Sequence, residues 1–247
     1  MSRVAVVTGG ASGIGLGVAD ELASNGHLVA ILDRNGPAAD AAAGELRTKG
    51  AKAIAIEVDV ADRASVDRAF AQIRSDLGPV EILITSAGIE SFDAVPDITA
   101  EKWDRIIAVN LTGTFTCVQA ALPDMLAAGW GRIVTISSSS AQSGAPNMAH
   151  YAASKGGVIA LTKALAVELA RSGITVNTIP PSLVDTPMAR QAEADGDFPG
   201  VDVVGPMVPL GRAGTPADIA AACSFLCSDD GSYITGQIIG VNGGMYI

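Results

Sequence analysis

The sequence predicts an α/β fold: a single domain, residues 1–247, built on a doubly wound parallel sheet of about seven strands with helices on both faces. Short apolar runs alternate with longer segments of helical character along the whole chain. A short, continuously apolar run is typical of a strand buried on both faces, and its alternation with helices indicates a parallel sheet. No linker, repeat or break in composition divides the chain, whose length fits one large domain.

The expected strands follow one another at regular intervals. They are residues 4–7, 28–32, 53–58, 81–84, 133–137, 174–177 and 237–241. The first run leads through a glycine-rich turn into a helix that ends near Asn25-Gly26, and the second run comes next. This is one strand–helix–strand unit of the kind that builds a parallel sheet. A helix over residues 37–49 repeats the pattern before the third strand.

Capping signals mark several helices. Asp62 is placed to cap a helix that reaches about Leu77, and Thr215-Pro216-Ala217-Asp218 combines a capping hydroxyl, a first-turn proline and an acid. A long helix over residues 100–127 carries Asn110 near its middle. Asparagine is a poor helix former, so we expect a local distortion there.

The helix expected over residues 151–171 is apolar almost all round and rich in small residues. A helix without a polar face must be covered on both sides, which predicts the sheet on one side and another subunit on the other. The following segment, residues 180–211, contains five prolines after the first and has no clear period. It is expected to be a long functional loop with short helices, and residues 181–211 are the candidate substrate loop.

The glycine-rich turn, Thr8 to Gly15, lies between a strand and a helix. Glycines let backbone approach a pyrophosphate closely, and the helix N-terminus offers free N–H groups and a positive dipole. Asp33 ends the second strand, 18 residues after Gly15, where an acid binds the ribose hydroxyls of an adenosine. A carboxylate there repels a 2′-phosphate, which favours NAD(H) over NADP(H), although the adjacent Arg34 softens that preference.

Composition excludes several other classes of function. A net charge of −10 argues against nucleic acid or an anionic membrane as the main partner. Three cysteines imply no disulfide framework, and two histidines without a Cys/His cluster make a metal site improbable. No uninterrupted apolar run reaches about 18 residues, and a strand begins almost at Met1. These features predict a soluble, cytoplasmic protein without a bound metal.

The residues most suggestive of chemistry are Tyr151 and Lys155, which are four apart and share one face of their predicted helix. An ammonium beside a phenol favours the phenolate and lowers the tyrosine pKa from about 10, which makes proton transfer possible near neutral pH. Ser138 precedes Tyr151 by 13 positions, at the end of a strand. A lone Tyr-x-x-x-Lys pair arises by chance in many helices, so its assignment depends on these surroundings.

Over essentially its whole length the chain resembles the short-chain dehydrogenase/reductase family. The matching residues are Thr8-Gly9, Gly13, Gly15, Asp59-Val60, Ala87-Gly88, Asn110, Ser138, Tyr151 with Lys155, Asn177, Pro209-Leu210-Gly211-Arg212 and Tyr233-Ile234-Thr235-Gly236. The resemblance implies a Rossmann-like fold and an NAD(P)-dependent oxidoreductase acting on CH–OH groups. It also implies a homotetramer, which would supply the second subunit that the apolar helix predicts.

The resemblance further implies a role for each catalytic candidate. Tyr151 would exchange a proton with the substrate oxygen, and Lys155 would lower the tyrosine pKa and bind the nicotinamide ribose. Ser138 would hold the substrate oxygen, and Asn110 would hold a water linking Lys155 to solvent. Ser137, Ser139 and Ser140 flank this serine. The spacing to Tyr151 favours Ser138, but a misplacement by one residue remains open.

Two sets of binding residues complete the expected site. The dinucleotide is expected to contact Gly9, Ser12, Gly13, Ile14, Gly15, Asp33, Arg34, Asp59, Val60, Ala87, Gly88, Tyr151, Lys155, Pro181, Val184 and Thr186. The substrate pocket is expected to include Glu90, Ser140, Gln142, Met148, Ser182, Leu183 and Met188. An acid at Glu90 would disfavour a carboxylate on the substrate nearby.

The chain departs from the family pattern at two turns. After the fourth strand, Thr85-Ser86-Ala87-Gly88 stands where the family commonly has Asn-Asn-Ala-Gly, so the hydrogen bonds of this turn are expected to differ. After the sixth strand, Pro181-Ser182 stands where the family commonly has Pro-Gly, so the shape of the pocket is expected to differ.

In character the chain is closest to 3-oxoacyl thioester reductases, acting on acyl-carrier-protein or CoA thioesters. The alternatives are an NAD-dependent dehydrogenase of a free secondary alcohol, a hydroxysteroid or 3-hydroxyacyl-CoA, and, outside enzymes, a cofactor-binding redox sensor.

Overall fold

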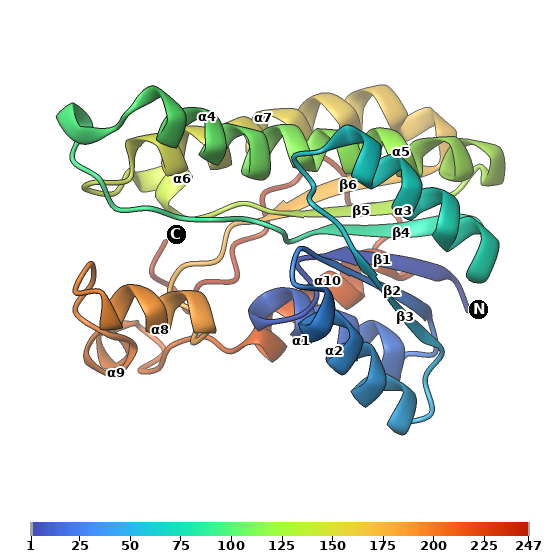
Figure 1. Ribbon diagram of the computed structural model, residues 1–247, viewed down its shortest axis with the longest axis horizontal. Coiled ribbons are helices and arrows are strands. Elements are labelled where there is room, and N and C mark those ends of the chain that lie inside the picture. Colours follow the sequence, from blue (N-terminus) through green and yellow to red (C-terminus); the bar gives the residue numbers. More distant parts are fainter. Residues whose placement is uncertain (1, 247) are drawn as a thin grey trace.

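The computed structural model describes residues 2–246, which fold around one six-stranded parallel sheet (Figure 1). The strand order is β3-β2-β1-β4-β5-β6, so the chain winds outward from β1 in both directions. This confirms the α/β class and the doubly wound arrangement. The strands are β1 (Val4–Thr8), β2 (Leu28–Asp33), β3 (Ala53–Glu57), β4 (Val80–Thr85), β5 (Gly131–Ile136) and β6 (Ile174–Ile179).

Helices cover both faces of this sheet, as the alternating pattern predicts (Figure 1). One layer contains α3 (Arg63–Asp76), α4 (Ala100–Ile107), α5 (Gly113–Ala128) and α7 (Ala149–Leu169), which a 3₁₀ turn extends over Ala170–Ser172. The opposite layer contains α1 (Gly13–Ser24), α2 (Gly36–Thr48) and α10 (Pro216–Cys227). The expected caps form, since Asp62 accepts the Ala64 N–H and Thr215 forms a capping box with Asp218.

The strand pleat divides the core into two apolar clusters. In β1, Val4 and Val6 pack with α3, α5 and α7, whereas Ala5 and Val7 pack with α1, α2 and α10. Successive side chains of a strand point to opposite faces, so a strand covered on both sides must be apolar at every position. This is why the strands of this chain show continuous apolar runs.

The expected seventh strand, residues 237–241, is not formed, and this part of the prediction is wrong. The segment meets β6 at a single bridge between Thr178 and Ile238. The next ladder bond would need an N–H from residue 180, which is a proline and has none. On the other side of the bridge, one backbone bond remains, from Gly236 N–H to the Val176 carbonyl (2.8 Å). Side chains take up the neighbouring positions: Val176 N–H donates to Thr235 Oγ1 (3.1 Å) and Gln237 N–H donates to Asn177 Oδ1 (3.0 Å).

The long helix is interrupted as Asn110 predicts. A π-helical turn, Ala108–Thr112, separates α4 from α5. The helical stretch Ala100–Ala128 is long and apolar enough to cross a membrane, but 56% of its most apolar window is buried within the protein. Because α5 packs against β4 and β5, the burial identifies it as a core helix.

The segment after β6 is more regular than expected. It folds into α8 (Pro187–Ala194), α9 (Val201–Val204) and a 3₁₀ turn (Gly205–Met207), which form a lobe beyond the carboxyl ends of the strands (Figure 1). The Arg190 guanidinium ties this lobe together, since it pairs with Asp185 before α8 (2.8 Å) and with Asp202 in α9 (2.9 Å). The lobe lies opposite α4 and α6 (Ser140–Ser143), which leaves a cleft between them.

Candidate active site

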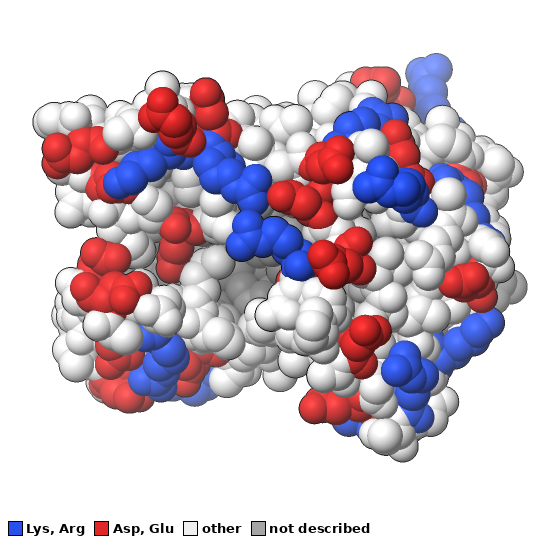
Figure 2. Space-filling view, viewed as in Figure 1, with Lys and Arg blue, Asp and Glu red and all other residues white. Residues whose placement is uncertain are grey.

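A cleft of about 520 Å³ opens at the carboxyl ends of the strands and reaches under the α8–α9 lobe. Figure 2 shows the hollow, with lysine and arginine side chains along one border. All sixteen expected dinucleotide residues line it, together with Ser138 and every expected substrate-pocket residue except Gln142. Gln142 is exposed on α6 and is not part of the cleft wall. The prediction that it lines the substrate pocket is therefore corrected.

The glycine-rich turn between β1 and α1 forms one end of the cleft. A Cβ on Gly15 would overlap the carbonyl oxygen of Gly9 and lie 2.7 Å from the carbonyl carbon. Gly9 has φ +65°, and a Cβ there would lie 2.8 Å from Ala87 Cα. The Ser12 side chain does not cap α1, so the N–H groups of the first helical turn remain available. This backbone surface with a positive dipole fits a pyrophosphate.

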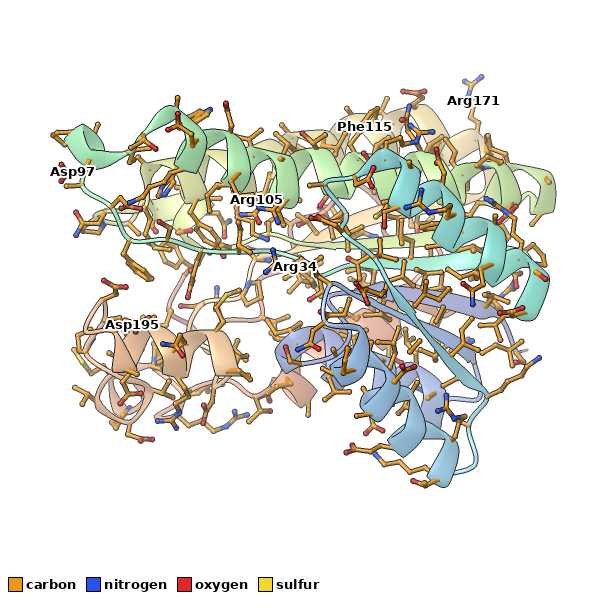
Figure 3. All side chains as sticks on the ribbon, in the orientation of Figure 1. Arg34, Asp97, Arg105, Phe115, Arg171 and Asp195 are labelled. Atoms are coloured by element: carbon orange, nitrogen blue, oxygen red, sulfur yellow. The ribbon has the colours of Figure 1, made fainter. Side chains whose placement is uncertain are left out.

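Asp33 is held beside this turn by two backbone donors. Ala11 N–H donates to Asp33 Oδ2 (3.1 Å), and Asn35 N–H donates to Asp33 Oδ1 (3.0 Å). Each oxygen keeps a free lone pair for the ribose hydroxyls of a dinucleotide. Arg34 is exposed next to it, and Arg105 reaches the same region from α4, on the opposite wall (Figure 3).

The serines at the end of β5 have different hydrogen-bond partners. Ser137 is buried, and its Oγ accepts a hydrogen bond from the Thr178 hydroxyl (2.9 Å). Ser138 lines the cleft, accepts hydrogen bonds from the N–H and the hydroxyl of Ser140 (3.2 and 2.9 Å), and acts to lower the pKa of the Tyr151 phenol. Ser137, Ser139 and Ser140 line the same cleft, so the choice of Ser138 as the catalytic serine stays a prediction.

Tyr151 and Lys155 both face the cleft from the first turns of α7, with Lys155 Nζ 5.8 Å from the centre of the tyrosine ring. The Lys155 ammonium donates to the Ile136 carbonyl (3.0 Å), and burial lowers its pKa to about 8. The expectation of a lowered tyrosine pKa does not hold for the protein alone. Burial and the Glu90 carboxylate raise the pKa of Tyr151, and the Ser138 side chain opposes them.

Asn110 lies beneath the cleft rather than in its wall. Its amide oxygen accepts from Ile89 N–H (2.9 Å), and its amide nitrogen donates to the Ile89 carbonyl (3.0 Å) and to Ser154 Oγ (3.0 Å). Gly88 makes room for this arrangement, since a Cβ there would lie 3.3 Å from both Asn110 Oδ1 and Lys155 Nζ. The role of Asn110 in holding a water stays a prediction.

The two departures from the family pattern have different consequences. Thr85 Oγ1 is buried without a hydrogen-bond partner, so the turn after β4 lacks a side-chain bond at this position. The Ser86 and Ala87 N–H groups instead donate to Thr8 Oγ1 (3.2 and 3.1 Å). Ser182 is accommodated without a positive φ, which occurs among the described non-glycine residues only at Asn147.

Several wall residues were not identified from the sequence. Phe92 and Phe198 line the cleft from the segments after β4 and α8. Aromatic residues make up only 4% of the chain, so two phenylalanines in loops were a usable signal. Arg105 could not be found in this way, because its Asp59 partner (3.4 Å) is 46 residues away.

Comparison with known proteins agrees with this geometry. A family model described as Enoyl-(Acyl carrier protein) reductase matches residues 9–246. The chain is 39% identical over 245 residues to the 3-oxoacyl-[acyl-carrier-protein] reductase MabA of Mycobacterium tuberculosis (strain ATCC 25618 / H37Rv), covering 99% of this chain and 93% of the relative. It is also 39% identical over 248 residues to the 3-oxoacyl-[acyl-carrier-protein] reductase FabG of Staphylococcus aureus (strain N315), covering 100% and 99%.

Solved structures show the same likeness. A variant of actinorhodin polyketide ketoreductase, crystallised with NADPH, superposes with a TM-score of 0.95 at 35% identity, covering 99% of this chain and 97% of that one. The crystal structure of gox2181 gives a TM-score of 0.93 at 34% identity, covering 98% and 95%. The chain therefore belongs to the short-chain dehydrogenase/reductase family of NAD(P)-dependent oxidoreductases, which act on CH–OH groups and the corresponding carbonyls.

Proposed function

We propose that the chain is an NAD(H)-dependent oxidoreductase that interconverts a secondary alcohol and a ketone, with a 3-oxoacyl thioester of acyl carrier protein or CoA as the default substrate. The observation that carries this proposal is the convergence of Tyr151, Lys155 and Ser138 on a cleft whose other end is the glycine turn. The names of the MabA and FabG relatives support the default substrate.

Proton transfer is assigned to the side chains at the end of β5 and the start of α7. The Tyr151 phenol would give its proton to the ketone oxygen in reduction and take one from the alcohol in oxidation. Ser138 would donate a hydrogen bond to the same oxygen. Lys155, with a pKa near 8, would bind the nicotinamide ribose and exchange protons with solvent through a water held at Asn110. The bound dinucleotide supplies the hydride.

Asp33 supports the preference for NAD(H). Its carboxylate is fixed by two backbone amides at the place where the ribose hydroxyls of a dinucleotide would bind, so a 2′-phosphate would meet a like charge. Arg34, exposed beside it, is the group that would soften this selection. A related ketoreductase has been crystallised with NADPH, so the choice between the two cofactors depends on such local residues.

Asp33 also favours a second candidate, because biosynthetic reductases usually take NADPH. That candidate is an NAD-dependent dehydrogenase of a free secondary alcohol, a hydroxysteroid or 3-hydroxyacyl-CoA, working in the oxidative direction. A cofactor-binding redox sensor is the least supported function, because Tyr151 and Lys155 are both present and both face the cleft.

We further propose that the protein is a cytoplasmic homotetramer. Helix α7 packs on β6 along one side, whereas Val167 on the same helix is 84% exposed. Phe115 on α5 is also exposed, along the outer edge of this helical layer (Figure 3). Exposed apolar side chains on neighbouring helices are typical of a subunit interface.

A Tyr151→Phe variant tests the catalytic assignment. We expect NADH binding to be retained and the turnover number to fall by about 10²–10⁴-fold, because only the transferable proton is removed. Turnover is measured with both cofactors on a panel of secondary alcohols and acyl-CoA thioesters. Tyr233→Phe is the matched control, since Tyr233 is fully exposed and lies outside the cleft. Full activity of Tyr151→Phe would refute the assignment, and NAD binding without any turnover by the natural chain would favour the sensor.

A further inference from the structure

Glu90 is a carboxylate in the cleft for which the proposed reaction has no use. It lies on the segment after β4 and lines the same wall as Tyr151 and Lys155. It is partly buried, and within residues 2–246 it takes part in none of the hydrogen bonds or ion pairs that hold the site together. The Lys155 ammonium favours the charged form of Glu90 at a distance but forms no hydrogen bond with it, so the carboxylate oxygens stay free to accept hydrogen bonds from a ligand.

The backbone holds this carboxylate in place. The preceding residue, Ile89, is bonded on both its N–H and its carbonyl to the Asn110 side chain, and Asn110 is itself fixed by Ser154 on α7. The segment that carries Glu90 is therefore attached to the helix that carries Tyr151 and Lys155. A rigidly mounted acceptor beside the reacting group can discriminate between substrates.

The charges around Glu90 point in the same direction. The Glu90 carboxylate acts on both catalytic side chains, because it raises the pKa of Tyr151 and opposes the fall in the pKa of Lys155. Asp197, on the lobe across the cleft, adds a second negative charge near Glu90. Figure 2 shows acidic side chains on both lobes at this end, whereas arginines border the dinucleotide end, where Figure 3 labels Arg34 and Arg105.

We propose that Glu90 selects the substrate: it accepts a hydrogen bond from a donor group, a hydroxyl or an ammonium, carried near the reacting carbon, and it rejects substrates with a carboxylate there. This inference rests on the proposed alcohol–ketone chemistry and narrows its substrate class. A 3-oxoacyl thioester offers only carbonyl acceptors around its ketone, so the inference favours hydroxylated or amino-substituted alcohols over the default substrate.

The test compares substrates that differ only in the group beside the reacting alcohol: cyclohexanol, trans-cyclohexane-1,2-diol, trans-2-aminocyclohexanol and 2-hydroxycyclohexane carboxylate. Wild type, Glu90→Gln and Glu90→Ala are assayed for kcat/KM with NAD. We expect wild type to prefer the diol over cyclohexanol by about 10-fold or more, as a hydrogen bond to a charged acceptor allows. Glu90→Ala should abolish this preference. The control is Glu45→Gln, an exposed carboxylate on α2.

The variants separate the two donor chemistries and the two levels of the proposal. An ammonium donor loses an ion pair in Glu90→Gln, so kcat/KM for the amino alcohol should fall strongly. A hydroxyl donor can still hydrogen-bond to the glutamine carbonyl, so kcat/KM for the diol should fall less. Either variant should raise kcat/KM for the hydroxy acid. Diol-to-cyclohexanol ratios unchanged in both Glu90 variants would overturn the inference while leaving the alcohol–ketone chemistry intact. If no alcohol is turned over, the proposed function fails. The role of Glu90 is then decided by calorimetry with bound NAD, from the ratio of the dissociation constants of the diol and cyclohexanol in wild type and in the Glu90 variants.

Discussion

Gly15→Ala is the sharpest test of the glycine cradle. The new methyl group would overlap the Gly9 carbonyl oxygen and lie 2.7 Å from its carbon, both backbone atoms. Neither side can retreat easily. The Gly9 turn is in contact with Ala87, and α1 is in contact with Pro216 of α10 through Gly17, where a Cβ would lie 2.7 Å from Pro216 Cβ.

The magnitude follows from two opposing effects. Alanine in place of a helical glycine stabilises a helix by about 0.5–1 kcal/mol. Overpacking against atoms that cannot move costs about 1–3 kcal/mol, and more where the obstruction is backbone. We therefore expect Gly15→Ala to lower the free energy of unfolding by about 1–3 kcal/mol. Because the first turn of α1 must shift, NADH binding should weaken at least about tenfold.

Gly44→Ala is the matched control, also a helical glycine but on α2. A methyl group there would meet only the flexible Arg47 side chain at 3.7 Å, so this variant should gain about 0.5–1 kcal/mol and bind NADH normally. Urea unfolding and a fluorescence titration with NADH measure both effects. A Gly15→Ala protein with an unchanged or higher unfolding midpoint and normal NADH affinity would refute the reasoning. Lost stability with normal affinity would mean that the pyrophosphate binds elsewhere.

Two further predictions concern charged groups in the cleft. Asp33→Asn should reduce the ratio of kcat/KM for NAD to that for NADP at least tenfold, because like charges about 4 Å apart cost about 4 kcal/mol near a protein surface; an unchanged ratio would show that another residue selects the cofactor. Lys155 has a pKa of about 8 in the fold and about 10.4 when unfolded, so the unfolded chain binds more protons between these values and stability should rise with pH. In cofactor-free protein the buried thiols of Cys117, Cys223 and Cys227, whose pKa values burial raises, lower stability over the same pH range in every variant. The Lys155 contribution is therefore read as a difference: between pH 8 and 9.5 wild type should gain about 1–2 kcal/mol relative to Lys155→Met by urea unfolding, and equal slopes would contradict the buried-ammonium assignment.

The parts of the fold that the sequence could predict are those with local causes. Continuous apolar runs predicted six strands because both faces of this sheet are covered, and Asn110 predicted the break in the long helix because its side chain competes with helical bonding. The missing seventh strand had a local cause as well. Pro180 removes the next ladder donor, a signal present in the sequence but outweighed there by the apolar run 237–241.

The substrate end of the cleft could not be predicted in the same way, because its geometry depends on contacts between distant residues. The Arg190 bonds that organise the α8–α9 lobe, and the position of Phe198, have no period along the chain. The pKa of Tyr151 shows the same limit. Its spacing to Lys155 correctly placed both groups in one cleft, but burial, which depends on the whole fold, determines the direction of the shift.

Asn110 connects the two halves of the site. Through Ile89 it fixes the segment that carries Glu90, and through Ser154, whose hydroxyl donates to the Tyr151 carbonyl (2.7 Å), it reaches the first turn of α7. Asn110 is fully buried. Solvent water therefore cannot replace a hydrogen-bond partner that a mutation removes from this network. The group proposed to recognise the substrate and the group proposed to transfer its proton are thus held by one buried asparagine, at the turn where its own helix changes from α to π.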